Sequence, residues 1–175
     1  VPVTGKISTI FECAMVEGKS NKAGRDVKFL ATNKLYNTFD DAIKSNLRFR
    51  VTGKVDGTCC IIMNGKFMKR RDMKEGRKVP TDWVETSPPD KKGHIIGFMP
   101  VQLTGKDDKW FKEAIVTTET TIMIKALVIE NGITIIKNIP IEDLEGQTVE
   151  FVGPKVQSDL HKVGVHCVIP HGIFE

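Results

Sequence analysis

Four consecutive residues, Lys54-Val55-Asp56-Gly57, are the part of the sequence best suited to covalent chemistry. In an extended backbone the side chains of Lys54 and Asp56 lie on the same side, and Gly57 would let a phosphate or a ribose approach the main chain. A lysine amine is nucleophilic only after it loses its proton, which nearby positive charge favours. A bound Mg²⁺ or the basic pair Arg70 and Arg71 would supply that charge. The alternative is a surface lysine at a turn made by Asp56 and Gly57.

Positive charge is concentrated in residues 66–78. The 175-residue chain has 26 Lys+Arg and 22 Asp+Glu, a net charge of +4. Residues 66–78 contain seven basic and two acidic residues, a local charge of +5, so the rest of the chain is net −1. This concentration predicts a surface that binds the phosphates of a polyanion. A solvated end of a hairpin is the alternative, because most charged runs are simply exposed.

Composition limits the class of protein. Hydrophobic residues make up 40% of the chain, too many for a disordered protein, and 175 residues predict one domain, residues 1–175. The apolar runs are much shorter than the roughly 20 residues that cross a bilayer, so no membrane span is expected. The four cysteines form no CxxC pair and are expected to be reduced core residues. Adjacent Cys59 and Cys60 would face opposite sides of a strand.

Two Asn-Gly dipeptides predict tight β-hairpins, because both residues tolerate positive φ. Asn64-Gly65 lies between expected strands 58–63 and 66–70, and Asn131-Gly132 lies between 121–130 and 133–137. Alternating or β-branched runs predict further strands at 47–51, 148–152 and 166–169. Residues 33–46 are expected to form a loop and a short helix, and 74–105 an ordered insertion or long loop. The expected fold class is therefore α+β, dominated by antiparallel strands.

Lys54-Val55-Asp56-Gly57 resembles motif I of the covalent nucleotidyltransferases, which comprise ATP-dependent DNA and RNA ligases and mRNA capping enzymes. When more of the chain is considered, the resemblance points to one family within this superfamily. Five blocks in order are similar to the vertebrate-type cytosolic 5′ to 3′ RNA ligase family and its microbial and viral relatives. They are residues 29–32, 53–60, 93–101, 148–153 and 169–172.

The resemblance implies an antiparallel-sheet-rich nucleotidyltransferase (adenylation) domain in an ATP-dependent RNA ligase. Lys54 would attack the α-phosphate of ATP to form a lysyl-adenylate, while Asp56 orients the reacting groups and Gly57 admits the nucleotide. Arg70 would contact ribose and phosphate, with Arg71 as its rival, and Glu150 would bind ribose hydroxyls. An exposed strand carboxylate is the alternative for Glu150.

The same resemblance implies partners and cofactors. The cofactors would be ATP with Mg²⁺ or Mn²⁺, although the sequence assigns no metal ligand. The substrate would be RNA with 5′-phosphate and 3′-hydroxyl ends, in a cytoplasmic protein, with the nucleus also open. Two residues near the end, His171 and Phe174, lie where such enzymes can place a group over the adenine. A capped strand end and a core phenylalanine, respectively, explain them as well.

The sequence departs from the family pattern in two places. Gly53 replaces an acidic residue that precedes the lysine in near relatives. Two downstream motifs, a metal-binding Glu-Gly and a lysine pair, are absent, and the late Glu145-Gly146 precedes the 148–152 strand, which is the wrong order. We therefore expect a domain incomplete at its C-terminus, whose missing groups a separate C-terminal segment would supply. A capping-type guanylyltransferase and a non-catalytic RNA-binding module that uses residues 66–78 remain the alternatives.

Overall fold

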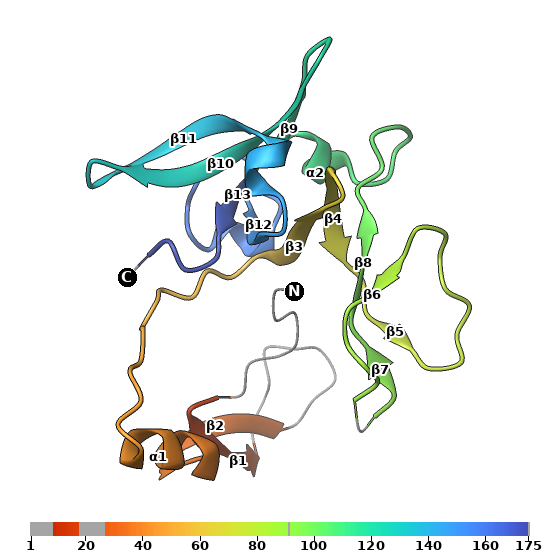
Figure 1. Cartoon of the computed structure of the whole chain (residues 1–175). Helices are drawn as coiled ribbons and strands as arrows, with labels where there is room; N and C mark the ends of the chain where they lie inside the picture. Colours follow the sequence, from red (N-terminus) through yellow and green to blue (C-terminus); the bar gives the residue numbers. More distant parts are fainter. Residues whose placement is uncertain (1–8, 18–26, 91, 175) are drawn as a thin grey trace. The chain divides into compact units, whose positions relative to one another are not determined.

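The computed structural model describes residues 9–17, 27–90 and 92–174 (Figure 1). The chain divides into two compact units, one within Lys6–Arg50 and the other within Val51–Glu175. The prediction that residues 1–175 form one domain stays a prediction. No helix in the described part of the chain is long and apolar enough to cross a membrane.

The unit within Lys6–Arg50 is a β-hairpin followed by one helix. Strand β1 (Phe11–Glu17) pairs antiparallel with β2 (Val27–Leu35), and α1 (Asn37–Lys44) follows. The short helix was predicted, but the strand runs to Leu35 where a loop was expected at 33–35, and β1 was not predicted. None of the described side chains of this unit is buried.

The predicted strand at 47–51 is wrong. Residues 47–57 have no regular secondary structure, and the apolar side chains of Leu47, Phe49 and Val51 are 59%, 49% and 82% exposed. Alternation of apolar and polar residues shows which face a strand would bury, but a strand also needs a neighbouring edge. Here both edges of the next strand are occupied by other strands, and the Phe49 ring instead packs against Phe39 of α1, 5.0 Å between centroids.

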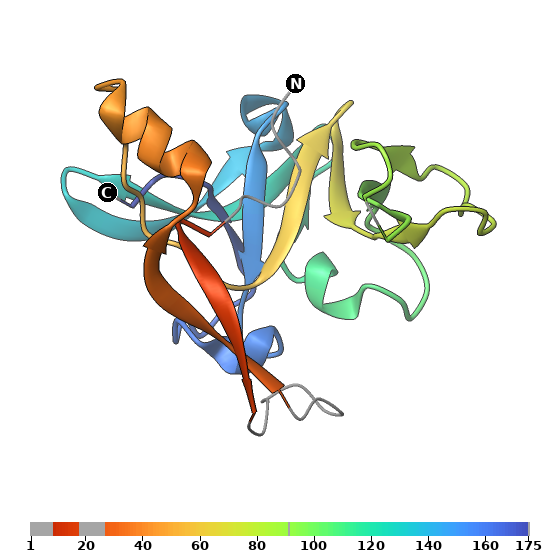
Figure 2. The same cartoon turned by 90° about the horizontal axis from the view of Figure 1, so that it is seen from below.

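The unit within Val51–Glu175 is built around one nine-stranded sheet. Its strand order is β11-β10-β13-β12-β3-β4-β8-β6, with β9 paired to β10, and only the β10–β13 pair is parallel. Figure 2 shows β13, β12, β3 and β4 side by side in the middle of the sheet. The strands are β3 (Thr58–Met63), β4 (Lys66–Arg70), β6 (Val84–Glu85), β8 (Gly97–Pro100), β9 (Ile115–Thr117), β10 (Ile122–Glu130), β11 (Ile133–Pro140), β12 (Thr148–Val152) and β13 (Cys167–Pro170).

Both Asn-Gly hairpins are confirmed. Asn64 and Gly65 have φ of 54° and 65° between β3 and β4, and Asn131 and Gly132 have φ of 51° and 76° between β10 and β11. The strand at 148–152 is also confirmed, and the last strand is shifted by one residue to 167–170. The antiparallel-rich sheet with few helices agrees with the expected α+β class.

The described part of the predicted insertion at 74–105 is ordered and partly joins the sheet. It contains β6 and β8 of the main sheet, and its β7 (His94–Ile95) pairs with β5 (Met73–Lys74), at the start of the insertion, in a separate small sheet. The Trp83 indole lies where Gly97 has no side chain, because a Cβ on Gly97 would lie 2.1 Å from the ring. Trp83 Nε1 donates a hydrogen bond to the Arg71 carbonyl oxygen at 2.7 Å, which fixes the insertion to the end of β4.

The core packs on both faces of the sheet. On one face Phe151 of β12 stacks on Phe111 of α2 (Lys109–Lys112), with ring centroids 4.3 Å apart, and Cys60 belongs to the same cluster. Cys59 packs on the opposite face, as predicted. All four thiols are free, and Cys13 is exposed rather than in the core. Two short 3₁₀ helices, η1 (Ile141–Leu144) and η2 (Gln157–Asp159), flank β12.

Candidate active site

The segment that carries Lys54 leads directly into β3 and is fixed by its own backbone. Gly53 N–H donates to the Phe174 carbonyl oxygen at 2.7 Å, Asp56 N–H to His161 Nε2 at 2.9 Å, and Gly57 N–H to Glu150 Oε1 at 2.8 Å. The three acceptors come from three separate parts of the chain. A segment without regular secondary structure is thereby held at three points within five residues.

The side chains of this segment alternate between core and solvent. Val55 packs against the buried cluster of Leu127, Val152, Cys167 and Ile169. Lys54 and Asp56 lie on the exposed side, with side chains 79% and 52% exposed, and their Nζ and Oδ1 atoms form an ion pair. The two side chains therefore share a face, as the extended backbone predicted.

Gly57 is a glycine because the protein itself fills the space beside it. A Cβ at this position would lie 2.2 Å from the Phe151 carbonyl oxygen and 3.0 Å from Val152 Cγ1. The close approach expected of a nucleotide is thus made by strand β12. The bond from Gly57 N–H to Glu150 depends on the same approach.

Glu150, Cys59 and Arg70 lie in one row across the sheet. Glu150 of β12 is directly opposite Cys59 of β3, and the β3–β4 register continued by one residue brings Arg70 beside Cys59. Burial, with the Glu150 carboxylate as a smaller contribution, raises the pKa of the Cys59 thiol to about 11. The register therefore brings together two residues, Arg70 and Glu150, that are 80 positions apart in the sequence.

Arg70 is held in place by a carboxylate. Its Nε and Nη2 donate to the two carboxylate oxygens of Asp72 at 2.7 and 2.9 Å, and these hydrogen bonds raise the pKa of the guanidinium. Arg71 follows the end of β4: its N–H donates to the Gly97 carbonyl oxygen and its side chain is exposed beside Met99. Of the two rival arginines, Arg70 is the one in the row with Glu150.

Glu150 also connects the lysine segment (residues 53–57) to His171. Its second oxygen, Oε2, lies 2.9 Å from His171 Nε2, and His171 Nδ1 lies 2.9 Å from the Thr148 hydroxyl. Since a carboxylate only accepts hydrogen bonds, Nε2 donates to Glu150, and in a neutral ring Nδ1 accepts from Thr148. Glu150 is buried, so the alternative of an exposed strand carboxylate is wrong.

Part of the positive charge at 66–78 is neutralised within the fold. Lys69 forms a largely buried ion pair with Asp108, and Arg70 is paired with Asp72. The side chains of Lys66, Arg71, Lys74, Arg77 and Lys78 belong to exposed residues. Asp72 is already included in the sequence count of +5, so the pairing of Lys69 with Asp108, which lies outside the segment, lowers the charge available to a polyanion by one.

Two residues that bind the ends of β3 were not identified from the sequence, His161 before its start and Glu145 at the turn after its end. His161 lies in the loop between β12 and β13 and accepts the Asp56 N–H across 105 positions of sequence, which no local pattern indicates. Glu145 was considered only as part of a misplaced motif. In the structure its two carboxylate oxygens accept the N–H groups of Asn64 and Gly65 at 2.6 and 2.9 Å.

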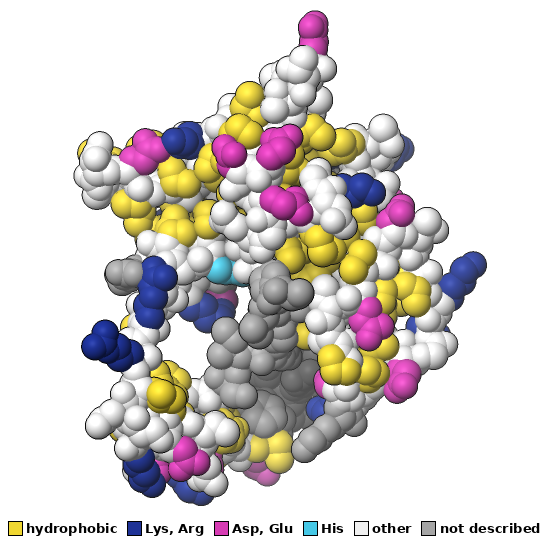
Figure 3. Space-filling model, in the orientation of Figure 1, with side chains coloured by type: hydrophobic (Ala, Val, Ile, Leu, Met, Phe, Trp, Pro, Cys, Tyr) yellow, Lys and Arg dark blue, Asp and Glu magenta, His cyan; other side chains and the backbone are white. Residues whose placement is uncertain are grey.

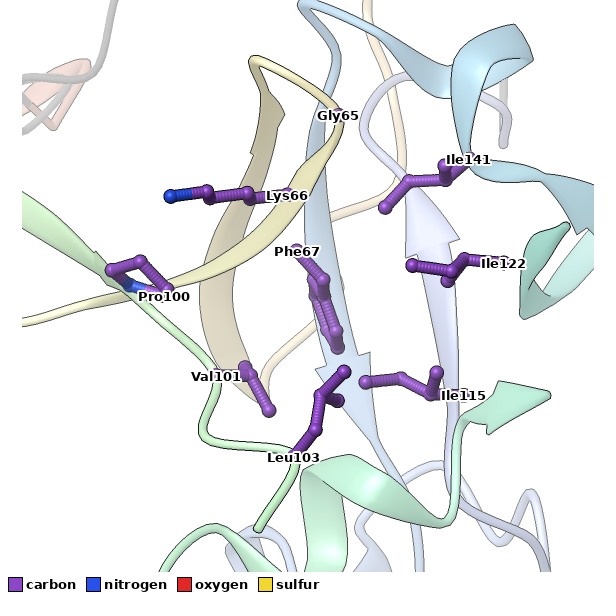
Figure 4. Close-up of a pocket in the computed structure, with 9 residues that line it drawn as sticks. All are labelled: Gly65, Lys66, Phe67, Pro100, Val101, Leu103, Ile115, Ile122 and Ile141. Carbon is purple, nitrogen blue, oxygen red and sulfur yellow. The ribbon is translucent and has the colours of Figure 1, made fainter. Parts of the chain in front are cut away.

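Among the described residues, neither a cluster that could hold a metal ion nor a cavity lined by Lys54 is found. The described residues contain no group of three or more His, Cys, Asp or Glu side chains placed to hold a metal ion. A cavity of about 200 Å³ is lined by apolar side chains, among them Phe67, Leu103, Ile115 and Ile122 (Figure 4). The Lys66 ammonium points away from these side chains, so the cavity offers no charged group for a phosphate.

Comparison with known proteins decides the family. The sequence profile of the RNA ligase 1 family matches residues 74–175, more than half of the chain. The chain belongs to the RNA ligase 1 family. This confirms the resemblance to the vertebrate-type RNA ligases. The profile match begins after Lys54, so it covers Glu150 but neither Lys54 nor Arg70.

Individual relatives of the family match over longer stretches. RNA ligase 1 of Pongo abelii is 25% identical over 224 aligned positions, which cover 98% of this chain and 68% of that protein. RNA ligase 1 of Rattus norvegicus is 26% identical with the same coverage. RNA ligase 1 of Danio rerio is 26% identical over 70% of this chain and 52% of that protein. The chain thus spans between half and just over two thirds of these relatives.

Proposed function

We propose that this chain is the adenylyltransferase part of an ATP-dependent RNA ligase that joins RNA 5′-phosphate and 3′-hydroxyl ends through a lysyl-AMP intermediate on Lys54. One observation carries the proposal. Within residues 53–57, three backbone hydrogen bonds and the Val55 side chain fix the segment, while Lys54 and Asp56 alone project together into solvent. Fixing a nucleophile while leaving it accessible is what a covalent group-transfer site requires. Membership of the RNA ligase 1 family supports the choice of substrate.

The proposed reaction has three steps. The Lys54 ammonium releases one proton to solvent, and Nζ, oriented by Asp56 Oδ1, attacks the α-phosphorus of ATP; the bond to pyrophosphate breaks, and the second proton also leaves to solvent. In the second step a 5′-phosphate oxygen of the RNA attacks the same phosphorus, the P–N bond breaks, and Lys54 recovers its protons. In the third step the 3′-hydroxyl oxygen attacks the RNA 5′-phosphorus and AMP leaves.

The proposal gives Arg70 and Glu150 binding roles. Arg70 Nη1 is not used by Asp72, so it is free to donate to a ribose or phosphate oxygen while Asp72 holds the guanidinium. Glu150 Oε2 is paired with the more exposed His171, and a ribose hydroxyl that displaces the imidazole would donate to that oxygen in its place. Oε1 would stay on the Gly57 N–H and keep the lysine segment in place.

The proposal also includes ATP as the nucleotide and a divalent metal ion. We propose that the Lys54 amine and the Arg70 guanidinium bind the triphosphate of ATP. No described cluster provides three metal-ligating side chains. Mg²⁺ is usually held by few carboxylates together with substrate phosphates. We therefore propose Mg²⁺ or Mn²⁺ as a companion of ATP, with further groups supplied by a separate C-terminal segment.

Covalent labelling tests the proposal. The protein is incubated with α-³²P-labelled ATP or GTP and Mg²⁺, and acid-labile label on the chain is measured by gel and by intact mass. ATP should label the wild type, and Lys54→Ala should lower the labelling at least about 10³-fold because the nucleophile is removed. Lys66→Ala, which removes another exposed lysine, should not change it. Labelling by GTP alone would instead support a capping-type guanylyltransferase, and RNA binding without any label would support a non-catalytic module.

A further inference from the structure

A second depression in the Val51–Glu175 unit lies between α2 and the loop that joins β12 to β13. Its volume is about 320 Å³. Trp110 and Glu113 line it from the region of α2, Lys125 from β10, and Lys155 and His166 from the loop. None of these residues belongs to the candidate site around Lys54.

The floor of this depression is a fixed stack of rings. His166 is 5% exposed and lies between Trp110 and Phe151, with ring centroids 5.3 and 5.7 Å away. His166 Nε2 accepts the Lys155 N–H at 3.3 Å, and Nδ1 lies 2.6 Å from Glu113 Oε2. Because both ring nitrogens have partners, the imidazole cannot turn, and Trp110 rests on a rigid support.

The ammonium groups of two lysines lie close to the Trp110 ring. The Nζ atoms of Lys109 and Lys155 lie 4.5 and 6.0 Å from its centroid. In the described part of the chain, no carboxylate forms an ion pair with either ammonium. An aromatic ring flanked by unpaired lysines matches how proteins hold single-stranded nucleic acid, with cations on phosphates and bases stacked on rings.

The loop that forms this depression also contacts the lysine segment. His161, six residues after Lys155, accepts the Asp56 N–H at 2.9 Å. A strand of RNA held at Lys155 could therefore follow the loop toward Lys54. This continuity favours a polymer over a free mononucleotide as the occupant.

We propose that Lys109, Trp110 and Lys155 form a binding site for single-stranded RNA near the end to be joined, with the two lysines on backbone phosphates and Trp110 against a base. The proposal rests on the proposed function for the identity of the polymer. It adds a contact surface distinct from the basic residues at 66–78.

The test is binding of a fluorescent, 5′-phosphorylated single-stranded RNA, followed by anisotropy at several salt concentrations. The double variant Lys109→Ala/Lys155→Ala should raise Kd about tenfold or more and lower the slope of log K against log salt by about 1.4, since about 0.7 is lost per phosphate contact. Lys109→Arg/Lys155→Arg should retain binding. The matched control, Lys34→Ala/Lys44→Ala, removes the same charge from two exposed lysines of the Lys6–Arg50 unit and should change Kd much less.

Three outcomes would overturn the proposal. They are unchanged binding in the alanine pair, an equal loss of affinity in the control pair, and complete displacement of the RNA by AMP alone at an AMP concentration that saturates this site. Thermal unfolding of each variant checks that the fold is kept. Labelling of Lys54 by ATP is measured on the same samples and should not change. If the wild type binds RNA at this site but takes no label, the RNA site stands and the proposed adenylylation fails.

Discussion

Gly57 shows how a residue selected for chemistry is also required by the fold. Because Gly57 has no side chain, the Phe151 carbonyl oxygen can approach it closely. This approach brings the Gly57 N–H within hydrogen-bond distance of Glu150 Oε1. Gly53, at the other end of the segment, has more room: a Cβ there would lie 3.2 Å from Phe174 Cβ. Two glycines four residues apart therefore differ in how much strain a methyl group would cause.

We predict that Gly57→Ala destabilises the protein by about 1–3 kcal/mol, because the main chain of β12 must shift to relieve the overlap. Gly53→Ala should cost less than about 1 kcal/mol, since a side-chain carbon can move a few tenths of an ångström. Urea unfolding followed by far-ultraviolet circular dichroism measures both values. Equal effects at the two positions would show that the Phe151 approach is not what requires the glycine.

At the scale of elements, the sequence predicted those turns and strands whose conformation is determined by adjacent residues. The Asn64-Gly65 turn was predicted because two adjacent residues determine its backbone angles. The prediction of a strand at 47–51 was wrong, because strand pairing depends on residues that are far away in the sequence. Arg70 and Glu150 could be chosen singly from motifs, but only the strand register places them in one row. His161 was missed for the same reason.

Glu145 illustrates a connection between elements. It precedes β12, yet its carboxylate accepts two N–H groups of the turn between β3 and β4. We predict that Glu145→Ala lowers the free energy of unfolding by about 1 kcal/mol, because two charge-assisted hydrogen bonds are lost at an exposed turn. Glu142→Ala, an exposed glutamate of η1 in the same segment, is the control and should change it by less than about 0.5 kcal/mol. If both variants match the wild type in urea titrations, the turn does not depend on Glu145.

At the scale of the whole molecule, the buried core is concentrated in one of the two units. Lys and Arg side chains are interspersed with acidic and apolar ones on the face shown in Figure 3. Every buried hydrophobic residue of the described chain lies between Cys60 and Ile169. The segments that hold the lysine segment also come from the Val51–Glu175 unit, since Glu150, His161 and Phe174 all follow residue 51.

This distribution predicts that residues 51–175 fold on their own. A protein with only these residues keeps all three buried clusters and should unfold cooperatively, with a Tm within about 4 °C of the full chain, because a loss near 1 kcal/mol shifts Tm by only a few degrees. Calorimetry of the full chain and of the shortened protein measures both transitions. The complementary piece, residues 6–50, should show no cooperative transition, since none of its described side chains is buried. A shortened protein without a transition would mean that the Val51–Glu175 core depends on the residues before it, and that residues 1–175 fold as one domain.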